Sequence, residues 1–495
     1  SAAPPTRSRG RRRRHMTGVP PVGRGAPMIV DGRALTHPTA AGRGIGRWVT
    51  TLVRSLHTVG ESPIVVADGG VGVEEWSRLV PDVDVRPLDR SLLRGVLANC
   101  DMEVPWYIAT QLMLHPVSLD PIPATVSEAG IPVAAVMYDV IPQRYPSRDL
   151  ANPAARRQSE LRSALARTID LMLAISDFAA RTARYELALG PIPVIDIGSA
   201  VEPSFHADDR VMRQRPGDVV VVGGADERKN ISRLLRAWAK VAEAVRTPRR
   251  LVVVAGVDRE THLRWNHEVV HLGLEGSVAL VGGVPEAELI DRLRRAELSV
   301  FPSTEEGFGL PVVEAAACGC PVICARGSSL DQVAGDTAIQ FDPYDVMSMA
   351  RAIESALVDE TLRTRLLAAA DRIAGRWTPE RLGGRVVEAL RVDHRSLCAR
   401  PARSPARRVA VGAETVDRAL EIAAALGEPV HSLFVAGDDL AARETGANAS
   451  ASTLRPVGMV GRDIGADEFD RLELDETADP SSMTGRRRAR AKVDR

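Results

Sequence analysis

The amino-acid sequence predicts an α/β protein with two doubly wound, parallel-sheet domains. Three observations lead to this fold class. The chain has 495 residues, which is too long for one hydrophobic core. Short runs rich in Val and Ile alternate with amphipathic stretches, and this alternation pauses near residue 205 and then starts again. Since such arrays place ligands at the carboxyl ends of their strands, we expect a binding cleft between the domains.

The first array predicts an N-terminal Rossmann-like domain over residues 27–205. Its apolar runs predict strands at 28–31, 63–67, 133–137, 171–175 and 192–195. Amphipathic periodicity predicts helices between them, such as 45–56 and 154–166. The polar, proline-containing stretch 202–216 predicts a linker to the next array.

The second array predicts a C-terminal Rossmann-like domain over residues 206–378. Strands are expected at 218–222, 251–255, 278–281, 298–301, 321–324 and 338–341. Helices are expected at 230–244, 285–295, 311–318, 346–356 and 360–374. One further helical pattern, within residues 379–394, is expected to return toward the N-terminal domain.

The two ends of the chain are biased in charge. Residues 1–26 are rich in arginine and are expected to form a disordered tail, within which Met16 is a candidate start. In residues 395–495 we expect a strand, helix, strand pattern (409–411, 415–426, 431–436) followed by disorder. The formal net charge is zero, so no specific nucleic-acid binding is expected. We expect solvated basic ends, with peripheral contact with anionic lipid as the alternative.

Cysteine usage and hydropathy indicate a cytoplasmic protein, with the inner face of the membrane as a second expected location. The five cysteines are odd in number, which favours reduced thiols. Cys318, Cys320 and Cys324 cluster where a helix ends and a buried strand begins, so we expect packing and no metal. No apolar run approaches the roughly 18 residues of a membrane span, and the arginine-rich start has no apolar segment behind it.

The most informative segment is 301–314, which reads FPSTEEGFGLPVVE. A strand ends there, a glycine-rich turn follows, and a proline sits in the first turn of a helix. Gly307 and Gly309 let backbone N–H groups approach a ligand closely, and the helix start favours an oxygen-rich or anionic group. Glu306 from the turn and Glu314 from the helix can hold sugar hydroxyls. The alternative is a capped helix with solvated glutamates.

A second site is predicted at residues 223–230, which read GGADERKN. This segment follows a buried strand and opens a helix, for which Asn230 is a suitable N-cap. Arg228 and Lys229 are cations at a helix start, where they oppose the helix dipole unless an anion binds. Fixed cations at such a place stabilise a departing diphosphate, so phosphate binding is favoured over a pair of solvated side chains.

Residues 306–324, EGFGLPVVEAAACGCPVIC, resemble the signature of the family-4 retaining glycosyltransferases of GT-B fold. The resemblance extends over about residues 28–392. Shorter matches occur in the expected order at 44–48 (GIGRW), 137–142 (MYDVIP), 282–285 (GGVP), 328–330 (SSL) and 335–336 (GD).

The resemblance implies roles for the residues that match the family's motifs. The residue at the position of Glu306 contacts the donor sugar, and the one at Glu314 contacts the ribose hydroxyls. The donor-binding positions are then Arg228, Lys229, Val284, Glu306, Gly307, Phe308, Gly309, Leu310 and Glu314. Gly46 and Arg47, taken as part of a loop after the first strand, are expected on the phosphate or acceptor side.

The expected catalytic residues are Glu306, Lys229 and Asp139. Asp139 either orients a hydroxyl or caps the following turn. Tyr138 stands where the family often has histidine and cannot act as a general base at neutral pH. Gln332 stands where the family commonly has glutamate, and this difference is expected to alter contacts with the acceptor or the donor.

The function expected from the sequence is retaining transfer of a hexose, with mannose favoured, to a glycan or lipid-linked acceptor. The donor would be GDP-mannose or a UDP-sugar, used as co-substrate. No metal or other cofactor is expected to be required, because fixed cations can stabilise the leaving group. Two alternatives stay open: a nucleotide-sugar epimerase or hydrolase on the same fold, and a non-catalytic module that binds nucleotide sugars.

Overall fold

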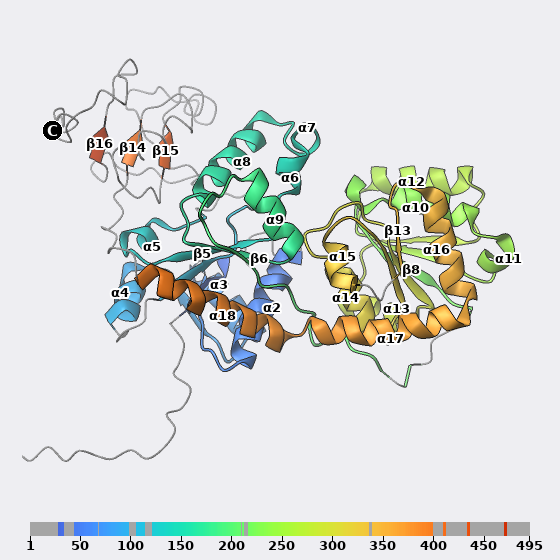
Figure 1. Ribbon diagram of the computed structural model, residues 1–495, viewed down its shortest axis with the longest axis horizontal. Coiled ribbons are helices and arrows are strands. Elements are labelled where there is room, and N and C mark those ends of the chain that lie inside the picture. Colours follow the sequence, from blue (N-terminus) through green and yellow to red (C-terminus); the bar gives the residue numbers. More distant parts are fainter. Residues whose placement is uncertain are drawn as a thin grey trace, which may run out of the picture.

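The structure is a computed structural model that describes most of residues 28–398 and three later strands. The described ranges are 28–33, 44–67, 69–98, 105–113, 121–208, 210–211, 216–335, 339–398, 409–411, 433–435 and 470–472. Two lobes, each a parallel sheet covered by helices, lie side by side along the long axis of the molecule (Figure 1). The two-domain α/β fold predicted from the sequence is confirmed.

The N-terminal sheet has the strand order β3-β2-β1-β4-β5-β6-β7, and every pairing in it is parallel. The strands are β1 (Met28–Asp31), β2 (Ile64–Ala67), β3 (Asp84–Pro87), β4 (Trp106–Ala109), β5 (Val133–Met137), β6 (Leu171–Ala174) and β7 (Val194–Asp196). The helices are α2 (Gly44–Thr58), α3 (Gly69–Leu79), α4 (Arg90–Ala98), α5 (Ala124–Glu128), α6 (Ile141–Arg144), α7 (Pro146–Asp149), α8 (Pro153–Ala166) and α9 (Asp177–Glu186). The central strands are buried along their whole length, as expected for a sheet covered on both faces.

The C-terminal sheet has the order β10-β9-β8-β11-β12-β13, again all parallel. Its strands are β8 (Val219–Val222), β9 (Leu251–Val254), β10 (Val278–Val281), β11 (Leu298–Phe301), β12 (Val322–Ala325) and β13 (Ile339–Phe341). The helices are α10 (Ile231–Lys240), α11 (Glu243–Arg246), α12 (Arg259–His271), α13 (Glu286–Arg295), α14 (Leu310–Ala317), α15 (Ser329–Ala334), α16 (Val346–Val358) and α17 (Glu360–Arg376). The strand order reverses between β8 and β11, so a ligand site is expected beyond the carboxyl ends of these two strands.

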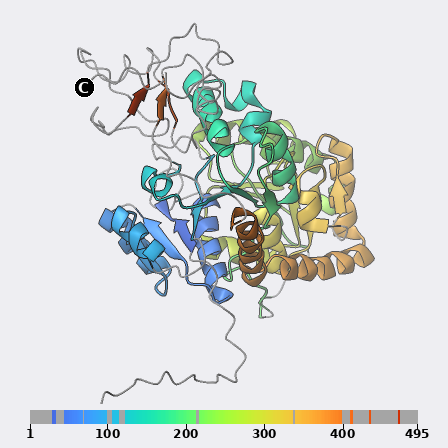
Figure 2. The ribbon, with the colours of Figure 1, turned by 60° about the vertical axis from the view of Figure 1, so that its left-hand side comes forward.

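Helix α18 (Pro379–Cys398) leaves the C-terminal domain after α17 and packs along α2 of the N-terminal domain (Figure 2). The two helices approach closely because Gly383 faces the backbone of α2. A Cβ atom at Gly383 would lie only 2.2 Å from the carbonyl oxygen of Ser55. The C-terminal end of the second domain is therefore anchored on the first.

Replacing Gly383 by alanine is expected to destabilise the protein by about 1–3 kcal/mol, the usual cost of overpacking a well-packed contact. The neighbouring Gly384 is a matched control, since a Cβ atom added there would meet nothing within 4 Å. Gly384→Ala should stabilise α18 by about 0.5–1 kcal/mol, because alanine loses less backbone entropy in a helix. Denaturant unfolding of both variants measures the difference, and equal stabilities would contradict the close helix contact.

Beyond α18 the structure describes a small parallel sheet in the order β15-β14-β16. Strands β14 (Val409–Val411) and β15 (Leu433–Val435) fall where the sequence predicted strands, whereas β16 (Asp470–Leu472) lies in a stretch expected to be disordered. The helix expected at 415–426, the arginine-rich start and Met16 lie outside the described residues.

Candidate functional site

The residues that follow β8 and β11 meet at the point where the strand order reverses. Arg228 and Lys229 belong to a short 3-10 turn (Glu227–Lys229) after β8, and Glu306 lies in the turn after β11. The Nζ atom of Lys229 is 2.6 Å from Oε1 of Glu306, and Nη1 of Arg228 is 2.7 Å from Oε2. The structure thus places the predicted phosphate-binding cations and the predicted sugar-binding carboxylate in direct contact.

The Glu306 carboxyl group is buried but charged. Burial alone would raise its pKa, yet the charges of Lys229 and Arg228 outweigh burial and lower the pKa to about 2. Burial also acts against the charge on Arg228, but Glu306, Asp226 and Asp139 together raise the pKa of that guanidinium above its usual value. Glu306 is therefore a permanent hydrogen-bond acceptor at neutral pH and cannot act as a general acid there.

The glycine-rich turn is held by its carbonyl groups. The hydroxyl oxygen of Ser329 lies 2.8 Å from the carbonyl oxygens of both Glu306 and Phe308. Ser176, from the N-terminal domain, donates a 2.6 Å hydrogen bond to the Gly307 carbonyl. Gly309 has a φ of +102°, a conformation that favours glycine. These contacts fix the backbone of the turn, as a site built from backbone amides requires.

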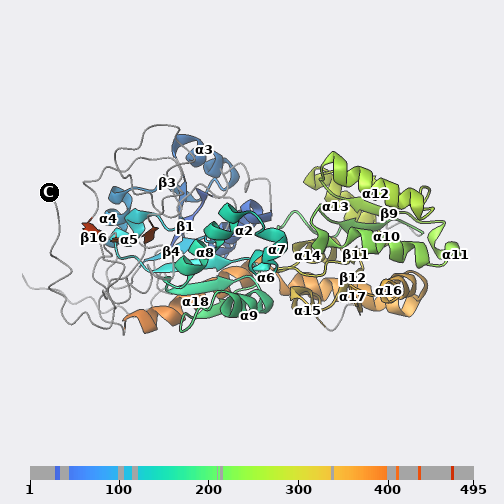
Figure 3. The ribbon, with the colours of Figure 1, turned by 90° about the horizontal axis from the view of Figure 1, so that it is seen from above.

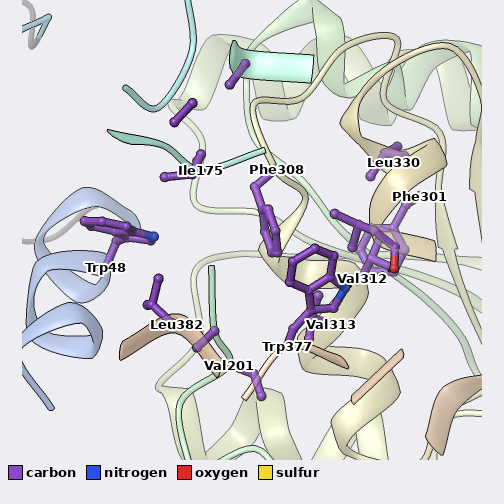
Figure 4. Close-up of a cluster of buried hydrophobic side chains, with 14 of the residues drawn as sticks. Trp48, Ile175, Val201, Phe301, Phe308, Val312, Val313, Leu330, Trp377 and Leu382 are labelled. Carbon is purple, nitrogen blue, oxygen red and sulfur yellow. Dashed lines mark hydrogen bonds between the residues drawn. The ribbon is translucent and has the colours of Figure 1, made fainter. Parts of the chain in front are cut away.

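An aromatic pair anchors the same turn in the hydrophobic core. The Phe308 ring meets the Trp377 indole edge to face, with 4.9 Å between ring centroids (Figure 4). Both side chains are about 2% exposed. In Figure 4 the two rings lie next to each other, with Val312 and Val313 of α14 beside the Trp377 ring. The Phe308 side chain is thus buried in the hydrophobic core, so only the backbone of Phe308 is available to a ligand.

Asp139 lies next to this turn from the N-terminal side. Its Oδ1 accepts a hydrogen bond of 3.1 Å from the N–H of Ile141, so it caps the turn that leads into α6, whose own N-cap position is Val140. Burial raises its pKa, while the Ile141 N–H and the charge of Arg228 act in the opposite direction. The structure therefore shows the capping contact, together with electrostatic coupling to Arg228 and Glu306.

Tyr138, the residue before Asp139, touches the glycine-rich turn with its backbone. A Cβ atom at Gly307 would lie 2.2 Å from the Tyr138 carbonyl oxygen. Its ring packs edge-on against Trp48 at 5.2 Å. Burial, with the nearby charge of Asp31, raises the pKa of its hydroxyl well above the usual value. The hydroxyl hence stays protonated at neutral pH.

Arg47 joins the two domains at the predicted ribose position. Its Nη2 atom is 2.9 Å from Oε1 of Glu314 and 3.3 Å from Oε2 of Glu286. Burial raises the pKa of Glu314, and the charge of Arg47 partly offsets this. Gly46 and Arg47 lie in the first turn of α2, and Gly46 is buried. This confirms the helix predicted at 45–56, and the description of these two residues as part of a loop is wrong. Their helical position aims Arg47 at α14 of the other domain.

Asn230 occupies the N-cap position of α10, as predicted, but makes no side-chain capping bond there. It adopts a left-handed conformation with φ of +59°. Its Nδ2 instead donates to the carbonyl oxygens of Pro302 and Pro343, at 2.9 and 2.8 Å. Asn230 therefore ties together the turns that follow β8, β11 and β13. Val284 is half-buried in the turn between β10 and α13, two residues before Glu286.

Sequence reasoning missed the contacts by which the two domains recognise each other. Gln332 accepts a 2.8 Å hydrogen bond from the Asp177 N–H and donates one of 2.6 Å to the Asp196 carboxylate. An amide can do both, whereas an ionised glutamate could not donate to Asp196. Glu305 pairs with Arg144 of α6. Neither pairing has a local signal, because the partners are more than a hundred residues apart in the sequence.

The clustered cysteines are packed as the sequence predicted. Cys318, Cys320 and Cys324 are each at most 1% exposed. Burial raises the pKa of the Cys324 thiol to about 12, which keeps it protonated. Within the described ranges, no helix is both long and apolar enough to cross a membrane.

Comparisons with known proteins give one family match and several relatives. Residues 207–372 match the family model described as "Glycosyl transferases group 1". The O-antigen chain mannosyltransferase B of Escherichia coli is 34% identical over 148 residues, which are 30% of this chain and 38% of that protein. The serotype-specific mannosyltransferase WbdA of Escherichia coli is 29% identical over 244 residues, 47% of this chain and 30% of that protein. This chain thus spans less than half the length of either relative.

A crystal structure of the Anabaena protein HepE in complex with UDP superimposes with a TM-score of 0.55 at 17% identity, over 74% of this chain and 100% of that one. At this identity the likeness concerns the fold alone. The matched range 207–372 includes Arg228, Lys229, Glu306 and Glu314. The second domain therefore resembles the glycosyl transferases group 1, and the chain has the GT-B fold and resembles mannosyltransferases, as the sequence predicted.

Proposed function

We propose that this chain is a family-4 retaining glycosyltransferase that moves a hexose, with mannose favoured, from a nucleotide-diphosphate sugar to an acceptor. The observation that carries the proposal is the contact of Arg228 and Lys229 with Glu306 at the strand-order reversal, beside a rigid glycine-rich turn. Mannosyltransferases among the relatives support the choice of mannose.

In this proposal the donor diphosphate lies against Arg228 and Lys229. Negative charge grows on the diphosphate as the glycosidic bond breaks, and fixed cations in a buried site stabilise that charge at little reorganisation cost. They supply the charge that a divalent cation provides in other sites, so no metal is required. Glu306 would share both cations with the diphosphate and accept hydrogen bonds from the hexose, as its lowered pKa permits.

The nucleoside would lie along α14. Glu314 would accept hydrogen bonds from the ribose hydroxyls, and Val284 would lie near the base. Arg47, which contacts Glu314, would then share that carboxylate with the ribose. The backbone amides of Phe308, Gly309 and Leu310 would hold the hexose.

The acceptor would approach from the N-terminal domain, between Asp139 and Arg47. Asp139 is buried close to Arg228 and Glu306, so a hydroxyl that it orients would lie near the reacting carbon. We propose a glycan or lipid-linked acceptor, met in the cytoplasm or at the inner face of the membrane. GDP-mannose is the first candidate donor and a UDP-sugar the second.

The test is a thermal-shift panel with GDP, UDP, ADP and dTDP, followed by assays of the matching nucleotide sugar. One nucleotide should raise the melting temperature, since a ligand at about 100 times its Kd stabilises by about 2.7 kcal/mol. Glu314→Ala should lose most of this shift. Absence of a shift with every nucleotide would overturn the proposal.

The donor assays separate the alternatives. Transfer with retention of the anomeric configuration, read by NMR of the product, is expected only when an acceptor is present. An epimerase would alter the donor sugar, and a hydrolase would release it, without any acceptor. A binding module would be stabilised by the nucleotide sugar and turn over none of it.

A further inference from the structure

Two exposed tyrosines from opposite domains lie at the edge of the candidate site. Aromatic residues make up only 4% of the sequence. In the described part of the chain, the aromatic side chains among the exposed large hydrophobics are Tyr145 (37% exposed), Tyr185 (82%) and Tyr344 (65%). We name Tyr145 and Tyr344 the tyrosine patch. Both of these tyrosines are linked to the loop that holds Arg228. Arg144, before Tyr145, pairs with Glu305, whose carbonyl oxygen accepts a 3.1 Å hydrogen bond from Arg228. Asn230, two residues after Arg228, donates to the carbonyl oxygen of Pro343, before Tyr344.

Each tyrosine of the patch is tied to the donor-site residues. Tyr145 lies between α6 and α7, directly after Arg144, which pairs with Glu305. Tyr145 also hydrogen-bonds to Glu305, the neighbour of Glu306. Figures 1 and 3 show α6 and α7 on the side of the N-terminal domain that faces the C-terminal domain. The N-terminal half of the patch therefore touches the second domain beside Glu306.

Tyr344 is tied to the other side of the same site. It follows Pro343, whose carbonyl oxygen accepts the 2.8 Å hydrogen bond from Asn230, the residue after Lys229. The guanidinium of Arg233 lies over its ring, 5.4 Å from the centroid. Since the side chain is 65% exposed, the rest of the ring is open to solvent. Tyr344 thus offers an apolar face next to the proposed diphosphate position.

The charges beside Tyr145 are compensated within the protein. Arg148, which lies over the Tyr145 ring at 4.8 Å, is paired with Asp149 at 2.7 Å. Arg144 is paired with Glu305. This half of the patch therefore suits a neutral ligand. A sugar has apolar C–H faces that pack on an aromatic ring and hydroxyls that can bond to such paired charges.

We propose that Tyr344 and Tyr145 form a subsite for acceptor glycan units beyond the one that receives the hexose. The inference rests on the proposed function and narrows its acceptor to a glycan of two or more sugars. The unit that reacts would lie near Asp139, and the preceding units would cross the border between the domains over the tyrosine patch.

The experiment measures binding of methyl α-mannoside and of linear manno- and malto-oligosaccharides of two to four units to the whole chain, by NMR saturation transfer and titration. The wild type should bind one oligosaccharide series more tightly than the monosaccharide. Tyr344→Ala should raise the Kd of that series about tenfold. Tyr344→Phe, which keeps the ring, should change it less than about twofold.

Val358→Ala is the matched control, because Val358 is 60% exposed at the opposite end of α16 from Tyr344. It should leave every affinity unchanged. Nucleotide-induced stabilisation is measured on the same samples. If the wild type binds a nucleotide but Tyr344→Ala binds oligosaccharides as the wild type does, the subsite is wrong and the proposed function stands. If the wild type binds the monosaccharide and the oligosaccharides with equal affinity, or binds no oligosaccharide, the proposed subsite is also wrong. If no nucleotide stabilises the wild type, the proposed function itself is wrong.

Discussion

Replacing Gly307 by alanine is expected to remove most sugar transfer while nucleotide binding stays nearly intact. The added Cβ would lie 2.2 Å from the Tyr138 carbonyl oxygen and 3.0 Å from the Asp139 Cβ. Gly307 belongs to the C-terminal domain and both neighbours to the N-terminal domain. The backbone carbonyl cannot turn away as a flexible side chain could, so the contact is relieved only when the domains move apart.

The size of the effect follows from the geometry of transfer. Gly307 is not among the glycines with positive φ, so alanine fits the turn within its own domain. A displacement of about 1 Å between reacting groups can lower a rate about 100-fold, and we expect kcat/KM to fall by about this factor. The nucleotide Kd should change less than about twofold, because its proposed contacts lie almost entirely in the C-terminal domain.

Steady-state kinetics and nucleotide titration of Gly307→Ala provide the measurement. Gly375→Ala is the matched control, since nothing lies within 4 Å of a Cβ at Gly375, on α17. It should behave as the wild type. A Gly307→Ala variant with wild-type kcat/KM would show that transfer does not need the observed contact between the turn and Tyr138.

Much of the fold could be predicted because most central strands carry their own signal. Buried runs such as Val133–Met137 and Leu251–Val254 are apolar along their whole length and were placed correctly. Two strands of the N-terminal sheet were missed for different reasons. Asp84–Pro87 is a largely exposed edge strand with charged residues, and Trp106–Ala109 has only one β-branched residue. Their pairing is decided by neighbouring strands, which a local pattern does not contain.

The candidate site divides in the same way. The glycine-rich turn and the two cations could be found because turn, strand end and helix start are contiguous in the sequence. The ion pairs between Arg47 and Glu314 and between Arg144 and Glu305 could not, since each joins residues from different domains. Sequence alone also offered no reason to prefer Gln332 over glutamate. Its two hydrogen bonds across the domain border supply that reason.

Lys229→Ala is expected to lower kcat about 100- to 1000-fold, the range seen when a group that stabilises developing charge is removed. Lys229 also neutralises Glu306. The single variant would therefore be inactive whether Lys229 stabilises the leaving diphosphate or only balances the charge of Glu306. The double variant Lys229→Ala, Glu306→Gln distinguishes them, because it removes the buried charge together with its partner. If Lys229 only balances Glu306, the double variant should recover activity to the level of Glu306→Gln alone.

We expect no recovery of activity in the double variant, since the diphosphate would still lack its cation.

The acid stability of the single variant gives an independent check on the ion pair. The folded-state pKa of Glu306 is lowered from 4.5 to about 2, so the pair's stabilisation is complete above about pH 4.5 and is lost as the pH falls toward 2. Without Lys229 that pKa rises toward its usual value, and acid unfolding should begin at a higher pH. Unchanged acid unfolding together with lost transfer would mean that Lys229 contributes nothing to the charge of Glu306 and acts on the donor alone. A variant with wild-type kcat would remove Lys229 from the mechanism.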